Sequence, residues 1–540
     1  MPSKRPTPAS FPSKLKHPAK QALANGPHLE TAATESGELV TRVRPSSSSS
    51  SSSTLQVPNR GDVIVDAHTS TANGKSEATP CGRMRANSFK ARPSLMDWET
   101  MQYTQNSFRG FFTLFWMTMA AYMALNLFNH WKSKGQFIGT RLFREMFYES
   151  SEFLLSELLL ILSLFTIFLW QKLLTHLAPL FLTHRHLSPR AICLTFQHTY
   201  QLTWFLTCIL WAMRAPWSWP QTGMFTLHAM AMLMKQHSYL AYNREMLGKW
   251  VQVQRRTIRM DELAARMKTL DDTTDAAELT VCNIEWETCK RQATELQIEL
   301  RKGTTAFPEN VTLPNFIDYL LVPTLVYELE YPRTDRIRIA YLLEKTAGFL
   351  GIAVCLYIVI EHLIYPVLAN LRNLSFAESI TQLLIPFMVC YMMIFYIIFE
   401  CICPWFAELT RFADRHFYSD WWNSLTFDDY ARKWNKPVHE FLLRHVYLES
   451  IATYKLSRRS ATFLTFFLSS CLHELLMIVL SGRVRCYLFG MQMMQIPLVV
   501  VSRWAGFRRW PRAGNAFFWG AMYLGPPLLG IAYCREMLAR

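Results

Sequence analysis

Residues Ser460–Leu480 read SATFLTFFLSSCLHELLMIVL, and this stretch decides the class of fold. It is about as long as the roughly 20 apolar residues that a helix needs to cross a bilayer. Its only charged or imidazole side chains are His473 and Glu474, which stand side by side near its middle. A spanning segment must satisfy its own backbone hydrogen bonds in lipid, which favours a helix. The stretch therefore predicts a transmembrane helix that carries an ionisable pair.

Working outward from this span, eight further apolar stretches approach or reach the same length. Glu157 and Glu361 interrupt two of them, and aromatic residues such as Trp217 and Trp519 crowd their ends, as in an interfacial belt. The chain is 50% hydrophobic and only 18% charged, which agrees with this density of spans. The sequence predicts an all-α polytopic membrane protein with about nine transmembrane helices. The eight further stretches lie near 110–130, 152–174, 191–213, 222–243, 346–368, 380–403, 485–502 and 514–534.

The first part of the chain has a different composition. Residues 1–95 are rich in Pro, Ser, Lys and Arg and include an unbroken serine run at Ser46–Ser53. Such a segment buries too little apolar surface to offset the entropy of ordering it. We expect a disordered polar and basic tail over 1–95, followed by one membrane domain over 96–540.

The net charge limits the classes of binding partner, and the cysteine pattern limits the kinds of covalent and metal site. Fifty-six basic against 41 acidic residues give a net charge of +15, which suits nucleic acid, an anionic membrane surface or a phosphate-bearing ligand. The long apolar runs make membrane lipid the expected partner and argue against nucleic acid. The 12 cysteines form no CxxC pair and lie mostly in or beside apolar runs, so we expect neither a disulfide framework nor a metal site.

Two long polar segments, about 244–345 and 404–460, interrupt the spans. Connections between spans are usually short, so these segments are where a soluble cosubstrate would be handled. We expect both to be cytosolic, with the N-terminus on the cytosolic side. The positive-inside rule supports this orientation only weakly, because the rule applies to short loops and these segments are long.

The His473–Glu474 pair is the first candidate for chemistry. An ionisable side chain at that depth is costly and is usually functional, although a histidine that only hydrogen-bonds a neighbouring helix is the alternative. A zinc-protease HExxH motif is excluded because Met477 stands at its second histidine position. Neighbouring residues on a helix point about 100° apart, so Glu474 is not expected to orient His473. A neutral imidazole there could act as a general base towards a hydroxyl.

Two further motifs stand in the polar segments. Phe417–Asn423 reads FYSDWWN and is followed by Asn435 in RKWNKPVHEF; an interfacial amphipathic helix is the alternative for this aromatic density. Pro323–Arg338 reads PTLVYELEYPRTDRIR, with Arg333, Arg336 and Arg338 close together. Clustered arginines suit phosphate recognition, but equally lipid headgroups or salt bridges.

Taken in order, FYSDWWN, the Trp434–Asn435 pair, the His473–Glu474 span and YPRTDRIR resemble the acyl-CoA:sterol O-acyltransferases of the membrane-bound O-acyltransferase superfamily. The resemblance runs from about Phe108 to the C-terminus. The blocks Leu233–Asn243 (LMKQHSYLAYN) and Arg485–Val500 look closest to sterol members, the latter to fungal ones. Pro437–Tyr447 (PVHEFLLRHVY) also looks fungal, but its PVHxxxxRHxY pattern occurs in diacylglycerol enzymes too.

This resemblance implies the membrane-bound O-acyltransferase fold and the transfer of a long-chain acyl group from acyl-CoA to a sterol 3β-hydroxyl, forming sterol esters for storage. The family's catalytic histidine falls on His473, as general base, and its asparagine on Asn435, as a positioning group or oxyanion donor. His237 is expected in the sterol pocket, where a packed structural histidine is the equal alternative. Acyl-CoA is a cosubstrate, and no cofactor or metal is expected. The expected acyl-CoA-binding residues are Tyr418, Asp420, Trp421, Trp422, Asn423, Arg432, Trp434, His439 and Ser469.

Two other functions stay open at this point. A diacylglycerol O-acyltransferase making triacylglycerol would differ in its acceptor. A non-enzymatic lipid or proton transporter would use His473 as a relay, but this does not explain FYSDWWN and WN together. The resemblance further implies a multi-pass protein of the endoplasmic reticulum membrane that forms a homodimer or a dimer of dimers.

Overall fold

The computed structural model describes residues 89–96, 109–137, 141–183, 189–270, 276–504, 506 and 509–538. Most of the predicted tail therefore lies outside the described residues. Its last part, Phe89–Leu95, is described and contacts the folded chain. The reason is local, because Phe89, Arg92 and Ser94 give this short stretch an apolar, an ionic and a polar anchor.

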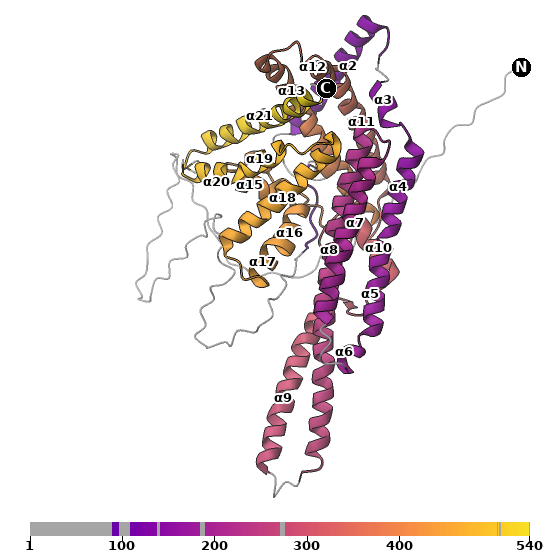
Figure 1. The fold of residues 1–540 in the computed structure, drawn as a ribbon, viewed down its shortest axis with the longest axis vertical. Helices are drawn as coiled ribbons and strands as arrows, with labels where there is room; N and C mark the ends of the chain where they lie inside the picture. The colour runs from indigo at the N-terminus through magenta and orange to yellow at the C-terminus, as the bar shows by residue number, and fades with distance from the viewer. Residues whose placement is uncertain are drawn as a thin grey trace, which may run out of the picture. The chain divides into compact units, whose positions relative to one another are not determined.

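The first half of the described chain is helical, and its longest element is α8 (Trp219–Met267). The predicted span at 222–243 continues as one helix into the polar segment that follows it. This helix packs against α7 and, further along, against α9 as an antiparallel hairpin (Figure 1). Apart from α8, the elements of this half are α2 (Arg109–Lys134), α3 (Arg141–Met146), α4 (Ser150–Ser163), α5 (Phe165–Leu177), α6 (Leu180–Thr183), α7 (Pro189–Arg214), α9 (Ala276–Glu299), the two-stranded β1 (Arg301–Lys302) and β2 (Thr305–Ala306), and α10 (Leu313–Leu321).

The second half holds the motif-bearing elements. Helix α18 packs against α19, α8 and α7, and α21 packs along α13. The elements are α11 (Ile339–Val359), η1 (Ile360–Ile364), α12 (Tyr365–Ala369), α13 (Phe376–Tyr396), η2 (Ile397–Ile402), α14 (Cys403–Leu409), η3 (Trp421–Asn423), α15 (Phe427–Lys433), α16 (Lys436–Leu442), η4 (Leu443–Leu448), α17 (Glu449–Ala452), α18 (Arg458–Ser481), α19 (Tyr487–Met493), α20 (Gln495–Trp504) and α21 (Pro511–Leu538).

Within the residues that the structure describes, five helical segments are long and apolar enough to cross a membrane. They coincide with five of the nine predicted spans, and every other predicted span is also helical where the structure describes it. The span expected at 485–502 is divided into α19 and α20; Pro497 lies in the first turn of α20, where its missing N–H is tolerated. The five segments are Ser150–Leu177, Ile339–Ala369, Phe376–Leu409, Arg458–Ser481 and Pro511–Arg535.

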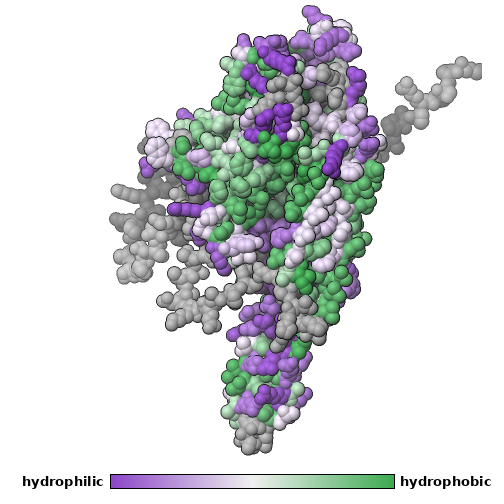
Figure 2. All heavy atoms as spheres, viewed as in Figure 1, coloured by the Kyte–Doolittle hydropathy of each residue, from purple (hydrophilic) through white to green (hydrophobic). Residues whose placement is uncertain are grey.

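Large apolar side chains are exposed along these segments, as expected for helices that face lipid. Leu154 on α4 is 65% exposed, Leu343 on α11 is 65% exposed and Ile385 on α13 is 66% exposed. Figure 2 shows apolar residues gathered over the middle of the visible face, whereas polar residues dominate the α8–α9 hairpin.

Three π-helical turns interrupt the helices, and each carries ionisable side chains. Element η1 contains Glu361 and His362, η2 contains Glu400, and η4 contains Arg444 and His445. Such turns insert an extra residue into the helical ladder and often occur at functional sites. They mark where polar groups enter otherwise apolar packing.

Candidate functional site

His473 lies on α18 with its side chain exposed. Its Nδ1 is 2.7 Å from the carbonyl oxygen of Ser469, one turn earlier. A carbonyl can only accept, so Nδ1 carries the proton and donates it. In the neutral ring this tautomer leaves the lone pair on Nε2, the form that a general base needs.

Glu474 turns the other way and is buried. Its carboxylate accepts hydrogen bonds from the backbone N–H groups of Cys486 (2.7 Å) and Phe489 (2.9 Å) and from the Tyr533 hydroxyl (2.9 Å to the nearer oxygen). No hydrogen bond joins it to His473 among the described residues, in agreement with the helical-angle argument. Glu474 instead ties α18 to the start of α19 and to α21.

Backbone hydrogen bonds bring the FYSDWWN loop and the segment around Asn435 together. The Ser419 N–H donates to the Lys433 carbonyl (2.9 Å), and the Lys436 N–H donates to the Phe417 carbonyl (2.9 Å). The Lys433 ammonium lies 3.2 Å from the Asp420 carboxylate. Two motifs that the sequence treats separately are therefore one structural unit.

An aromatic cluster forms the interior of this unit. The Trp434 indole stacks on the Tyr391 ring of α13 at 4.7 Å between centroids and meets Trp421 edge-on at 4.9 Å. Trp421 is fully buried, and Tyr418 is 1% exposed. These aromatics pack the loop against α13, so their role in the structure is to stabilise the fold around the loop. The interfacial amphipathic helix considered for this stretch does not form; only the short η3 turn is helical.

Asn435 occupies the N-cap position of α16. Its Oδ1 accepts from the Val438 N–H at 3.2 Å, the ordinary arrangement of a capping asparagine. This bond fixes the amide and leaves Nδ2 as a donor that has no hydrogen-bond partner within the described chain; the side chain is partly buried.

The remaining predicted acyl-CoA residues have mixed surroundings. The Asn423 side chain is exposed, and Trp422 presents its carbonyl to Asn515 (2.8 Å) and to the indole N–H of Trp519 (3.2 Å). Arg432 is paired with Asp428 and Asp429 on its own helix. His439 lies one turn after Asn435, with its side chain partly buried.

A partly buried cation that sequence reasoning missed belongs to this unit. The Lys436 Nζ is 2.8 Å from Nδ1 of His416. Burial, and then the positive charge of Arg92, lower the pKa of Lys436 to about 8. Burial and then the Lys436 charge lower the pKa of His416 to about 4, so the imidazole accepts and the ammonium donates.

The arginine cluster is largely committed to ion pairs. Arg333 pairs with Asp318, and the Arg338 guanidinium lies 3.1 Å from Glu408. Arg336 is exposed and has no ion pair within the described residues. It lines a pocket of about 430 Å³ with Arg338 and Tyr341. The salt-bridge alternative therefore accounts for two of the three arginines.

His237 belongs to a separate polar cluster. Its Nδ1 lies 3.1 Å from the Gln197 amide and 3.2 Å from the Gln201 amide, and its ring centroid is 5.2 Å from that of His445. Ligand-type atoms of His237, His445 and Glu449 lie within 4.8 Å of one another. The Arg244 guanidinium already lies 3.2 Å from Glu449, so this cluster contains its own cation and suits a divalent metal poorly.

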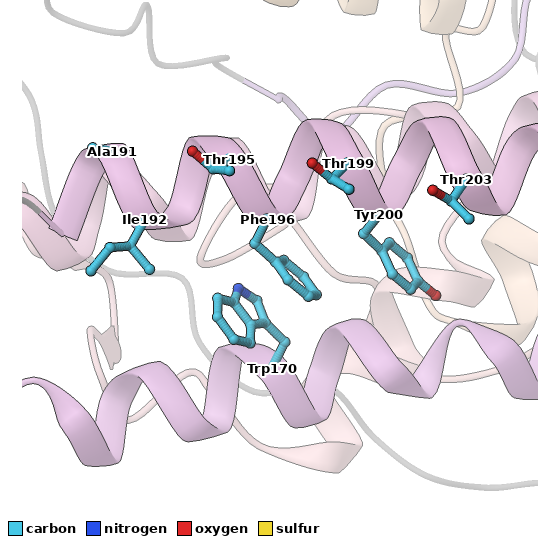
Figure 3. Close-up of a pocket in the computed structure, with 8 residues that line it drawn as sticks. All are labelled: Trp170, Ala191, Ile192, Thr195, Phe196, Thr199, Tyr200 and Thr203. Carbon is cyan, nitrogen blue, oxygen red and sulfur yellow. The ribbon is translucent and has the colours of Figure 1, made fainter.

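A shallow apolar groove of about 750 Å³ lies between α5 and α7. Figure 3 shows the Trp170 and Phe196 rings face to face, 3.8 Å apart, below a row formed by Thr195, Thr199 and Thr203. None of the predicted site residues lines it.

The structure thus joins FYSDWWN to Asn435 but forms no hydrogen bond between His473 and Asn435 in the part of the chain that it describes. Sequence reasoning also did not predict that Glu400, Tyr391 and Ser94 support this unit. Glu400 bonds Tyr418 and Ser94, and Tyr391 stacks on Trp434. Glu400 had a signal, since it is the charged residue directly after the uncharged run Ser379–Phe399.

Comparison with known proteins fits this arrangement. Residues 155–535 match the family model of the membrane-bound O-acyltransferase family. The chain is 32% identical to Probable sterol O-acyltransferase 1 of Schizosaccharomyces pombe, over 82% of this chain and 85% of that protein. It is 37% identical to Sterol O-acyltransferase 2 of Saccharomyces cerevisiae, over 57% and 49%, and 33% identical to Diacylglycerol O-acyltransferase 1B of Glycine max, over 43% and 48%. This chain therefore belongs to the membrane-bound O-acyltransferase family.

Proposed function

We propose that this protein transfers a long-chain acyl group from acyl-CoA to the 3β-hydroxyl of a sterol, releasing CoA. The observation that carries the proposal is the pairing of the FYSDWWN loop with the Asn435 segment, in a chain whose membrane helix α18 carries His473. The similarity to two proteins named sterol O-acyltransferases, one of them over most of both chains, supports the sterol as acceptor.

The chemistry follows from two polar groups. Nε2 of His473 takes the proton of the sterol hydroxyl as its oxygen attacks the thioester carbonyl carbon. An O–C bond forms and the C–S bond breaks. CoA leaves as a thiolate, which takes the proton from Nε2 of His473. Nδ2 of Asn435 donates to the oxyanion, a contribution typically worth about 2.7–4 kcal/mol of barrier.

Acyl-CoA recognition is assigned to the FYSDWWN loop and its surroundings, comprising Tyr418, Asp420, Trp421, Trp422, Asn423, Arg432, Trp434, His439 and Ser469. Lys436 is placed to contact a CoA phosphate. His237 contributes to the sterol pocket. The enzyme needs no cofactor or metal, acts in the endoplasmic reticulum membrane with a cytosolic N-terminus, and forms a homodimer or a dimer of dimers.

Microsomes that contain the wild-type chain should transfer labelled oleoyl from oleoyl-CoA to added sterol. His473→Ala should abolish this transfer, whereas Cys471→Ala, two residues earlier on α18, should retain it. Unchanged esterification by the His473 variant, at equal protein level, would overturn the catalytic assignment.

The second candidate acceptor is diacylglycerol, favoured by the similarity to the Glycine max protein. An equimolar mixture of sterol and diacylglycerol decides between them in one reaction. Sterol ester as the main labelled product supports the proposal, and label only in triacylglycerol replaces it with the second candidate.

A further inference from the structure

The segment Phe89–Met96, here called the strap, is bound along the polypeptide that leads into FYSDWWN. The Arg92 N–H donates to the Ala413 carbonyl (2.9 Å), and the Arg415 N–H donates to the Arg92 carbonyl (2.8 Å), forming an isolated parallel bridge. The Arg92 guanidinium also grips both oxygens of Asp414, at 2.9 and 2.6 Å. Asp414 is 5% exposed, so this bidentate pair is partly shielded from water.

The other side of the same polypeptide is held by the YPRTDRIR motif. The Ala413 N–H donates to the Pro332 carbonyl (2.9 Å), and Arg333 and Phe412 form an antiparallel bridge. The Phe89 ring closes one end against Tyr331 at 5.3 Å and Phe412 at 5.7 Å. The strap is therefore one of three strand-like segments, and its loss would leave one edge of the central segment unpaired.

At the strap's far end, Ser94 is fully buried and donates its hydroxyl to Oε1 of Glu400 at 2.6 Å. The Tyr418 hydroxyl donates to the same oxygen, also at 2.6 Å. Glu400 is itself fully buried on the π-helical turn η2. A buried carboxylate depends strongly on its donors, because an ionised group without them carries a large desolvation cost.

Tyr418 is the second residue of FYSDWWN, directly before Ser419, which bonds the Lys433 carbonyl. A change in the donor set of Glu400 therefore acts on the backbone that aligns the loop with Asn435. Ser94 reaches the proposed acyl-CoA site through two intermediates, Glu400 and Tyr418.

We propose that the strap completes the acyl-CoA site and that Ser94 is a positioning residue, which acts on Tyr418 by sharing the Glu400 carboxylate. The inference rests on the proposed function only for its kinetic readout. The strap's docking is a property of the fold and is measured separately.

The kinetic test uses the full-length protein in microsomes. Ser94→Ala removes one donor and should raise the KM for oleoyl-CoA about three- to tenfold, with a smaller change in kcat. Only part of the free energy of a hydrogen bond to a charged group reaches the acyl-CoA site, because Ser94 acts through Glu400 and Tyr418. Val281→Ala, which changes an exposed residue of α9 outside the strap and the proposed site, should leave both constants unchanged. An unchanged KM in Ser94→Ala would overturn the positioning role.

A negative charge introduced at position 94 provides the specific control. Ser94→Asp places a second carboxylate against buried Glu400 and should release the strap, with a KM increase larger than that of Ser94→Ala. Adding Glu400→Gln should recover much of the loss, because an amide can donate to the introduced carboxylate while still accepting from Tyr418. If the KM of the double variant is as high as that of Ser94→Asp, Ser94 does not act through Glu400.

Hydrogen exchange separates this inference from the proposed function. In the purified wild-type protein, the amides of Arg92 and Arg415 should be protected, and Ser94→Asp should expose both. Fast exchange of these amides in the wild type would overturn the strap. Protected amides in a protein that does not esterify sterol would overturn the proposed function and leave the docked strap standing.

Discussion

At the residue scale, the proposed site distinguishes the side chains that we assign to the chemistry from those that stabilise the fold. His473 and Glu474 are neighbours in sequence but differ in their surroundings. The His473 ring is exposed, whereas the buried Glu474 carboxylate accepts hydrogen bonds from three separate donors. In the proposed site Asn435 combines two roles in one amide: its oxygen caps α16, and its Nδ2 has no hydrogen-bond partner within the described residues. Substitutions that divide such combined functions test the site most sharply.

Asn435 allows that division. Asn435→Asp keeps an oxygen that caps α16 but removes the Nδ2 donor, so kcat should fall about 10²- to 10³-fold with little loss of stability. Asn435→Ala removes both and should also lower the melting temperature. Ser375→Ala, which deletes the N-cap of α13, is the matched control: it should cost about 1 kcal/mol of stability without the fall in kcat. Equal kcat in Asn435→Asp and the wild type would contradict the oxyanion role.

Lys436 makes a prediction about pH. Its lowered pKa of about 8 means that the ammonium is present below pH 8 and is lost as the pH rises through that value. If it contacts a CoA phosphate, the KM for acyl-CoA should rise between pH 7 and pH 9. His416 stays neutral throughout, because its pKa is about 4. Lys436→Arg retains the charge and should flatten the profile; a wild-type KM that does not change over this range would count against the contact.

At the element scale, α18 is fixed by what it binds at its buried face. Glu474 ties it to α19 and α21, and the loop that carries Asn435 is tied to α13 by stacked aromatics. The helical elements were largely predictable because apolar length identifies them. The continuity of α8 beyond its apolar part, the break between α19 and α20 and the docking of the strap were not, since each depends on tertiary partners that a local pattern does not contain.

The Glu474 anchor should be visible in stability. Tyr533→Phe removes one donor to a buried carboxylate and should cost about 1–3 kcal/mol, read as a lower melting temperature in detergent. Tyr523→Phe, on the same helix but with its side chain 41% exposed, should change the melting temperature little. Equal shifts for the two variants would mean that Glu474 does not depend on Tyr533.

At the scale of the whole molecule, the sequence predicted the fold class and the family, because motif order and membrane periodicity extend over most of the chain. The site was predicted in part. The residue types at His473 and Asn435 followed from family resemblance, whereas the joining of FYSDWWN to Lys433 and Lys436 is made by backbone atoms, which carry no sequence signature. Ser94 could not be found from the sequence, since its partner Glu400 lies 306 positions away.

Orientation in the membrane can be tested at two glycosylation sequons, Asn310-Val311-Thr312 and Asn373-Leu374-Ser375. Asn310 is 2% exposed and bonds Asn243 and Tyr327, so its amide cannot carry a glycan in the folded protein. Asn373 is exposed in the turn between α12 and α13. With a cytosolic N-terminus this turn faces the lumen, and lengthening it by a glycine–serine insertion should give a product sensitive to endoglycosidase H. Absence of the glycan in the lengthened turn, with a lumenal reporter glycosylated in parallel, would reverse the orientation.

The hydrogen bond between Ser94 and Glu400 also determines when the strap can dock during synthesis of the chain. The two residues are separated by 306 positions. At roughly 5–20 residues per second, the ribosome needs about 15 to 60 seconds between making one and making the other. The strap must wait through that interval while the intervening helices are synthesised. The proposed acyl-CoA site is thus completed by the part of the described chain that is synthesised first, and only after Glu400 has been made.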